Sequence, residues 1–410
     1  MPMPSPPVPT VTPVTSPALI VVTLSLLLGL QSVTTDLYLP ALPTITESLG
    51  ASMGQAQLTL TALLLAFGCS QLVWGPLSDR FGRRPILLWG LGAYVLASAG
   101  CALASSIDFF IGWRMVQGAA LGAGVMGARA ITRDLFTPVE GAHVMTQALT
   151  GLGLLTIITG PLGGLLTEAF GWRVAMFSLC VFGTLTLAVV AWRFTESNPH
   201  KNPQALNPTT LLRTWMGIAR HPTFRAFSAL STATYAGLFV FLASSSFVFI
   251  QVLGLTNTHY GFVMGSMPLA YIGGTFLCRR LLPGRGVLRT VAIGAGFTLA
   301  GGGLMAVLAW AGISSGWAIM PPFYLYMIGH GIHHPCAQSG AVGPFPQAAG
   351  AASALNGFLM MVMAFAVGGW LGSHMDGTVR PLAYGVCFWS VVTALVAWTW
   401  VQKQGGSGER

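Results

Sequence analysis

An acidic residue inside an apolar segment is the first place where this sequence carries chemistry. Asp36 stands in QSVTTDLYLPALP, and it is the one carboxylate that we place clearly within an apolar run. Burial disfavours the charged form of a carboxyl group, so such a group can exchange a proton near neutral pH. Ionisable groups in membrane segments usually face a polar cavity and mark an ion or substrate path. We therefore expect Asp36 to take up and release protons, with a packing hydrogen bond or a helix cap as the structural alternative.

A second cluster of ionisable side chains follows in the segment GHGIHHPC, residues 329–336. His330, His333 and His334 fall within roughly 100° on a helical wheel, so they can share one face. The spacing of His330 and His334 is that of the zinc-binding HExxH helix, but Gly331 stands where that motif has its glutamate. With no carboxylate nearby in the sequence, we expect no metal ion here, and we expect no cofactor. We interpret the imidazoles as a polar cavity wall; packing or a proton relay is the alternative.

An arginine in the apolar segment WRMVQGAALGAG is the third candidate. Arg114 can pair with Asp36, contact backbone carbonyls, or extend its charged end toward the membrane surface. Gln117 follows it on the same stretch. We expect both side chains to face a central cavity.

The composition indicates which elements position these groups. Of 410 residues, 53% are hydrophobic and 7% are charged, and the mean hydropathy is +0.70. A soluble domain usually has about 25% charged residues, so this surface cannot face water everywhere. Apolar runs of about 20 residues, the length that crosses a bilayer, recur along the chain. We predict an all-α polytopic membrane protein with twelve transmembrane helices, approximately at residues 18–43, 57–77, 86–105, 109–131, 144–168, 172–195, 224–250, 260–281, 287–311, 317–343, 350–372 and 381–401.

The formal charge of +9 indicates how these helices are oriented. With twelve spans and both termini on one side, all basic residues except Arg114, Arg173 and Arg380 fall on that side. This is the positive-inside pattern, so we expect both termini in the cytoplasm and the chain in the inner (plasma) membrane. The charge therefore does not indicate a nucleic-acid partner. The six cysteines form no CxxC pair, and we interpret them as small buried hydrophobic residues.

The order of the spans divides the chain into two bundles. A polar stretch separates the sixth span from the seventh, and the short basic loops GPLSDRFGRRP (75–85) and CRRLLPGRG (278–286) recur about 200 residues apart. Parallel halves of this kind are typical of proteins in which two bundles move about a central site. We expect a disordered cytoplasmic tail at 1–16, a six-helix bundle at 17–195, a cytoplasmic linker at 196–223, a second six-helix bundle at 224–401 and a cytoplasmic tail at 402–410.

The first of these basic loops has glycines for a tight turn and charges beside them. We expect its acid to bind a helix N-terminus and its arginines to hold the turn at the inner face, with Asp134 of the neighbouring loop as a partner. The expected role is a conformational latch between the bundles. The latch residues are Gly75, Asp79, Arg80, Gly82, Arg83 and Arg84.

Small residues surround a proline in the segment TGPLGGLL, residues 159–166. Gly160, Pro161, Gly163 and Gly164 allow a second helix to approach closely, and the proline is expected to bend the span. Close packing and a gating role are both compatible with this pattern.

Several of these segments together resemble a known family. GPLSDRFGRRP is similar to the loop signature of the major facilitator superfamily, and RMVQG and TGPLGG resemble signatures of its drug:proton antiporters. TDLYLPALP, GWRVAMF and GPFPQAAGAASALNGF resemble the bicyclomycin/chloramphenicol-resistance (Bcr/CflA) branch. The resemblance covers roughly residues 20 to 400 and implies a cavity open alternately to each side and export of drug-like molecules in exchange for protons. By position it implies that Asp36 is the proton-coupling carboxylate, Arg114 the cavity-side arginine and the 75–85 loop the latch.

We therefore expect a multidrug or antibiotic efflux transporter, a monomer in the lipid bilayer, with a small-molecule drug and protons as its partners. Tyr235, Phe239 and Phe241 of the seventh span are expected to form an adaptable apolar wall for the substrate. The same fold also fits a proton-coupled symporter that takes up a metabolite. A membrane metalloenzyme built around the histidines is a rival of another class. A passive channel is disfavoured because the sequence offers a single buried carboxylate and no repeated ring of charges.

Overall fold

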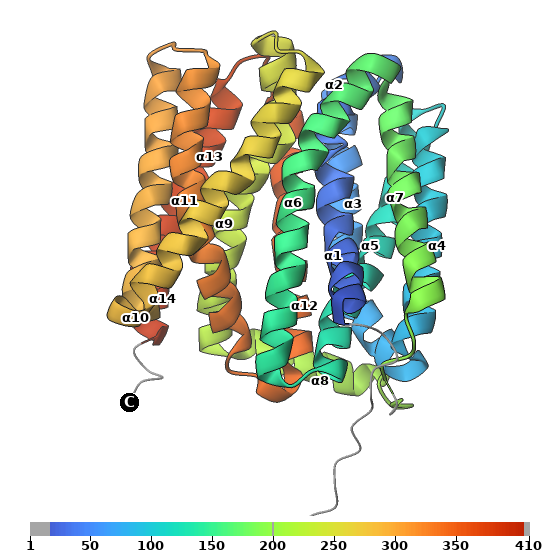
Figure 1. Ribbon diagram of the computed structural model, residues 1–410. Coiled ribbons are helices and arrows are strands. Elements are labelled where there is room, and N and C mark those ends of the chain that lie inside the picture. The colour runs from blue at the N-terminus through green and yellow to red at the C-terminus, as the bar shows by residue number, and fades with distance from the viewer. Residues whose placement is uncertain (1–16, 199–200, 406–410) are drawn as a thin grey trace, which may run out of the picture.

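The structure, a computed structural model, describes residues 17–198 and 201–405, and within these ranges every regular element is a helix. The predicted tail at 1–16 lies outside the described residues, as do residues 406–410 of the predicted C-terminal tail. Figure 1 shows two groups of long helices side by side, with α8 lying across the lower end. That lower end is the side predicted to be cytoplasmic.

The N-terminal half comprises the helices that precede α8. They are α1 (Pro17–Asp36), α2 (Leu42–Ser48), α3 (Met53–Phe81), α4 (Arg83–Ala102), α5 (Ile107–Leu135), α6 (Pro138–Phe170) and α7 (Trp172–Arg193).

The C-terminal half follows the linker. Its helices are α9 (Pro222–Ser246), α10 (Asn257–Trp310), α11 (Gly316–Val342), α12 (Ala349–His374), α13 (Arg380–Leu395) and α14 (Val401–Gly405). A π-helical turn (Phe247–Val252) continues α9, a 3-10 turn (Pro346–Ala348) precedes α12, and a second π-helical turn (Val396–Trp400) joins α13 to α14.

These helices give the twelve membrane-length segments that the sequence predicts. Within the described residues, nine helical stretches are long and apolar enough to cross a membrane. One of them is α10, which holds two spans joined at Gly286, where φ is 66° and the backbone is not helical. The other two spans are α5, with 29 residues, and α11, with 27. Arginines in α5 and prolines and histidines in α11 make these two segments less apolar than the rest.

The predicted linker contains a helix of its own, α8 (Pro208–Arg220). Asn207 caps its start, because the Asn207 side chain accepts hydrogen bonds from the backbone N–H groups of Thr209 and Thr210. Leu212 and Met216 are exposed on this helix. An amphipathic helix of this kind suits the surface of a membrane.

The first span is interrupted at the position of Asp36. The α-helix α1 ends at Asp36, and the chain then passes through a short 3-10 turn (Leu39–Ala41) into α2. Pro40 and Pro43 have no backbone N–H group to continue the helix. An interrupted helix at membrane depth is tolerated where protein or a polar cavity surrounds it.

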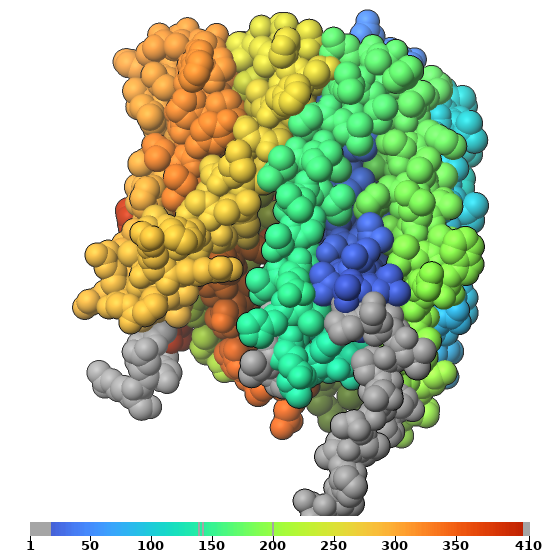
Figure 2. Space-filling view, in the orientation of Figure 1, coloured from blue at the N-terminus to red at the C-terminus, as the bar shows by residue number. Residues whose placement is uncertain are grey.

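The two halves meet along two pairs of helices, α3 with α12 and α6 with α10. Glycines permit these contacts: a Cβ atom at Gly68 of α3 would collide with Met361 of α12, and one at Gly164 of α6 with the backbone at Asn257. Figure 2 shows that α6 and α10 touch over their upper parts and that the surface is hollowed between them below, where α12 lies deeper. The α6–α10 contact therefore lies at the end opposite to α8, whereas α3 and α12 contact along much of their length.

Candidate functional site

Asp36 lies between the two halves of the molecule. Its side chain is half-buried, Thr35 Oγ1 donates to its Oδ1 over 3.5 Å, and Oδ2 is buried with no hydrogen-bond partner among the described residues. Tyr235 of α9 and Tyr260 of α10 lie close enough to interact electrostatically with this carboxyl. Asp36 of the N-terminal half therefore lies beside polar side chains of the C-terminal half.

Arg114 is fully buried inside the N-terminal half, with 0% of its surface exposed. Its guanidinium stacks on the ring of Tyr38 at 4.1 Å from the ring centre, and Nη1 donates to Gln117 Oε1 over 2.8 Å. Nε donates to the backbone carbonyl of Thr59 over 3.3 Å. Of the three arrangements predicted for this arginine, the structure has carbonyl contact, not an extension to the surface or an ion pair with Asp36.

Arg114 and Gln117 hold the turn that follows Asp36, instead of lining a cavity. Gln117 Nε2 donates to Ser98 Oγ over 2.8 Å, and Ser98 Oγ donates to the carbonyl of Tyr94 over 2.7 Å. The Tyr94 hydroxyl in turn bonds to Thr34, two residues before Asp36, while Tyr38 lies two residues after it.

The glycine-rich segment of α6 packs against the same turn and against the other half. A Cβ atom at Gly163 would collide with the backbone of Leu37, and one at Gly160 would come within 2.9 Å of the carbonyl oxygen of Gly261 in α10. These positions require glycine because backbone meets backbone. Gly160, Gly163 and Gly164 thus connect the interruption after Asp36 to the start of α10.

One contact at this interface was not predicted from the sequence. Glu168, near the end of α6, accepts a hydrogen bond of 3.0 Å from the backbone N–H of Thr258 in the first turn of α10. A carboxylate at a helix N-terminus is favourable because the first N–H groups of the helix have no partner within it. The sequence does show an acid near the end of α6 and an N-cap residue, Thr256, at the start of α10. It does not show that these two segments, about 90 residues apart, lie next to each other.

The 75–85 loop forms a charged network centred on Arg83, whose side chain is 4% exposed. Arg83 Nη1 lies 2.6 Å from Asp79 Oδ1, and its Nε lies 2.7 Å from Asp134 Oδ2. Arg133 joins at 3.9 Å from each of these two acids. Arg80 instead lies over the ring of Phe81 at 5.4 Å. The network joins the end of α3 to the end of α5, within the N-terminal half.

The carboxylate that binds the N-terminus of α4, next to this loop, belongs to Glu196 and not to Asp79 as predicted. Its oxygens accept from the backbone N–H groups of Arg83 and Arg84 over 2.8 and 3.1 Å, at the start of α4. Gly82 has φ of 106°, and a Cβ atom there would come within 2.5 Å of Glu196 Oε2. Glu196 therefore ties the linker to the loop, a role that the sequence analysis missed.

The wall predicted on α9 is only partly exposed to the space between the halves. Tyr235 is half-buried, whereas Phe239 and Phe241 are fully buried. Phe241 stacks on Phe323 of α11 with ring centres 3.7 Å apart. The two phenylalanines belong to the core of the C-terminal half, because helical spacing alone does not separate a core face from a cavity face.

The three histidines of α11 do not share one face. His330 Nδ1 lies 3.0 Å from Thr234 Oγ1, and His334 Nδ1 lies 3.1 Å from the hydroxyl of Tyr271, with the two imidazoles 5.7 Å apart. His333 points elsewhere: its Nε2 lies 3.1 Å from the carbonyl of Val291. Within residues 17–198 and 201–405, no group of three or more histidines, cysteines or acids is placed to hold a metal ion.

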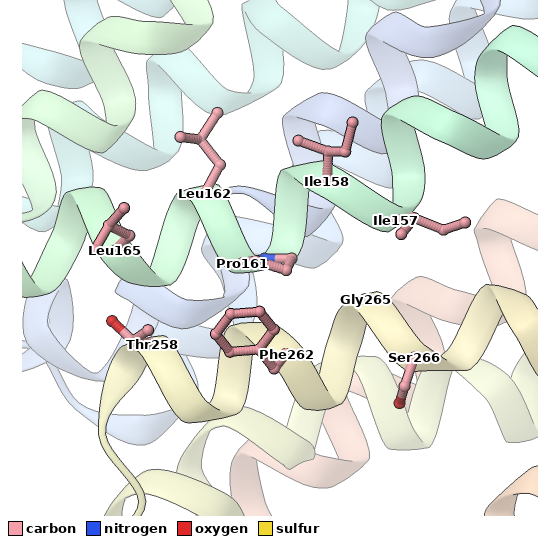
Figure 3. A pocket seen from close by; sticks show the side chains of 9 residues that line it. All are labelled: Ile157, Ile158, Pro161, Leu162, Leu165, Thr258, Phe262, Gly265 and Ser266. Atoms are coloured by element: carbon pink, nitrogen blue, oxygen red, sulfur yellow. The ribbon is translucent and has the colours of Figure 1, made fainter.

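A groove of about 620 Å³ runs between α6 and α10 on the outside of the molecule (Figure 3). Its lining is almost entirely apolar, and Ile158 and Phe262 are 57% and 61% exposed. Pro161 and Gly265 lie at its floor, where the two helices approach. This groove contains no ionisable side chain, so it does not supply the chemistry expected of Asp36.

Comparisons with known proteins agree with this architecture. Residues 24–369 match the Major Facilitator Superfamily. The chain is 30% identical over 389 residues to a chloramphenicol resistance protein of Pseudomonas aeruginosa, with 93% of this chain and 90% of that protein covered. It is 30% identical to multidrug resistance protein D of Escherichia coli (83% and 84% covered) and 26% identical to a bicyclomycin resistance protein homolog of Haemophilus influenzae (92% and 94% covered).

A solved structure shows the same fold at low identity. The crystal structure of a D-xylose-proton symporter superimposes with a TM-score of 0.72 at 16% identity, covering 93% of this chain and 97% of that one. The superfamily consists of transporters, so the chain is a multi-pass membrane transporter and not an enzyme. With its twelve segments, its interrupted first span and these relatives, the chain belongs to the major facilitator superfamily, in the bicyclomycin/chloramphenicol-resistance branch.

Proposed function

We propose that this transporter exports small drug-like molecules in exchange for protons. The observation that carries the proposal is the position of Asp36, an acid at a helix interruption between the halves with one buried oxygen that has no partner among the described residues. The names of the relatives, resistance to chloramphenicol, bicyclomycin or several drugs, support export of such compounds. We place the protein in the bacterial inner membrane as a monomer, with both termini in the cytoplasm.

In the proposed cycle, Asp36 binds a proton when the site is open to the outside. Neutralisation of the carboxyl favours release of the drug and closure of the outer side, where Glu168 then meets the start of α10. With the site open to the cytoplasm, Asp36 releases its proton and a new drug molecule binds. Exchange follows because the proton and the drug compete for one site.

The arrangement of the halves supports an inward-facing state in this cycle. The contacts of Gly160 and Gly164 with α10 lie at the end opposite to α8, and the hollow between α6 and α10 lies toward the α8 end (Figure 2). The network around Arg83 then has the role of a latch that holds the cytoplasmic ends of α3 and α5 together during the change of state.

Vesicles with an imposed pH gradient test the direction of exchange. In inverted membrane vesicles acidified inside, chloramphenicol is expected to accumulate, because protons leaving the lumen drive the drug inward. Accumulation only when the gradient is reversed would instead identify the proton-coupled symporter that the fold also allows. Vesicles without the protein give the background.

A further inference from the structure

A cationic side chain lies between the halves, apart from Asp36 and from the latch. Arg129 stands on α5, less than two turns before the helix ends at Leu135, and its side chain is exposed. Its Nη1 donates to Ser353 Oγ of α12 over 2.7 Å. The described part of the chain has four ion pairs, all made by Arg83 and Arg133, so Arg129 has no acidic partner there. A guanidinium in this position is available to an anion.

A histidine of the C-terminal half lies near Arg129. His334 of α11 lies within electrostatic reach of Arg129, and the hydroxyl of Tyr271 lies 3.1 Å from His334 Nδ1. When the phenol donates to Nδ1, the imidazole carries its proton on Nε2. Nε2 has no hydrogen-bond partner among the described residues, and the His334 side chain is half-buried, so this N–H group is available to a ligand.

Polar side chains extend this face along α11. Gln338 follows His334 by four residues, the spacing of one helical face, and its Nε2 donates to Ser353 Oγ over 2.9 Å. Its Oε1 accepts from Asn356 over 2.8 Å. Ser353 therefore joins Arg129 of one half to Gln338 of the other. No carboxylate takes part in these contacts.

We propose that Arg129 and His334, the latter held in its Nε2–H tautomer by Tyr271, form a binding site for the anionic group of a transported small molecule. A guanidinium with an imidazole N–H beside it is a strong partner for a carboxylate, because charge-assisted hydrogen bonds are roughly twice as strong as neutral ones. The inference rests on the proposed export of small molecules and gives its substrate chemistry: compounds that carry an acid group bind better than their neutral counterparts.

Two probes with one scaffold test this site in purified protein. Chloramphenicol is neutral, and its hemisuccinate ester carries one carboxylate. Binding of both is measured by tryptophan fluorescence in nanodiscs of phosphatidylcholine, without a pH gradient. The hemisuccinate is expected to bind about tenfold more tightly, the ratio that one net charge-assisted hydrogen bond of about 1.4 kcal/mol gives.

Variants separate charge from structure. Arg129→Gln is expected to remove the preference for the hemisuccinate and Arg129→Lys to keep most of it. Ser353→Ala breaks the bond across the halves but leaves the charge, so the preference should persist. Arg280→Gln removes an exposed cation that lies over Phe276, outside the site, and is the matched control. Thermal unfolding of each variant checks that it is folded.

The proposal is overturned if the wild type binds the two probes equally or binds neither of them. It is also overturned if Arg129→Gln keeps the full preference or if Ser353→Ala loses it. Loss of the preference when anionic phosphatidylglycerol is added to the nanodiscs also overturns it, because the site then belongs to lipid headgroups. Failure of proton-driven export in vesicles, with the charge preference intact, would contradict the proposed function alone.

Discussion

At the scale of single residues, Asp36 owes its position to Arg114, although the two side chains do not form an ion pair. Arg114 stacks on Tyr38 and bonds to Gln117, and the chain of bonds through Ser98 and Tyr94 returns to α1 just before Asp36. Nη2 of Arg114 is buried without a partner among the described residues. A buried guanidinium without a counter-ion is costly, so its presence points to function and not to stability.

Replacement of Arg114 should therefore separate stability from transport. We expect Arg114→Met to leave the thermal unfolding temperature unchanged or higher, and to lower drug transport roughly tenfold or more, because small displacements at a site can cost that much. Arg114→Lys should not restore transport, since an ammonium group cannot make the stack and both hydrogen bonds together. Arg173→Met, which removes the stack on Trp172 at the start of α7, is the control. A large loss of stability in Arg114→Met would contradict this account.

The sequence identified the individual residues of the site better than their surroundings. Asp36 stood out because a charge in an apolar run is rare and costly. The same rule found Arg114, but its burial against Tyr38 depends on the path of the chain after α1, which no local pattern specifies. The prediction that Phe239 and Phe241 line a cavity was wrong because the exposure of a helical residue depends on how its helix is rotated. Here the rotation of α9 against α11 turns Phe241 onto Phe323.

At the scale of helices, α6 connects the interruption after Asp36 to the C-terminal half. Gly163 faces Leu37 on one side, and Gly160 and Gly164 face α10 on the other. A change at the turn after Asp36 can therefore reach the contact between the halves through one rigid helix. This geometry shows close packing of the TGPLGG segment, and we propose a gating role for it as well.

A methyl group at Gly164 should weaken the contact between α6 and the start of α10. Gly164→Ala forces α6 away from Asn257, at a cost of about 1–3 kcal/mol for an overpacked interface. We expect faster hydrogen–deuterium exchange in the first turn of α10, including the Thr258 amide that Glu168 binds. Gly153→Ala, in the same helix with nothing within 4 Å of the added methyl group, should exchange like the wild type. Equal exchange in the two variants would show that the contact is not tightly packed.

At the scale of the whole molecule, the number and order of the spans were predictable from hydropathy. The prediction included α5 and α11, whose polar residues lower their hydropathy, because both still contain apolar runs of about 20 residues. The helix inside the linker was missed, since its amphipathic pattern is short, and so was the approach of α6 to α10. Contacts between the halves involve segments that are far apart in the sequence. A glycine in a helix indicates that another helix packs closely there, but it does not indicate which helix.

The most direct test of the central claim is proton movement caused by the drug. In proteoliposomes of the wild type, addition of chloramphenicol should move protons across the membrane against the drug. In Asp36→Asn this proton movement should disappear, while exchange of labelled for unlabelled drug continues because the binding site remains. Asp376→Asn, which changes an acid in the loop between α12 and α13, is the matched control. Normal drug-dependent proton movement in Asp36→Asn would contradict the account.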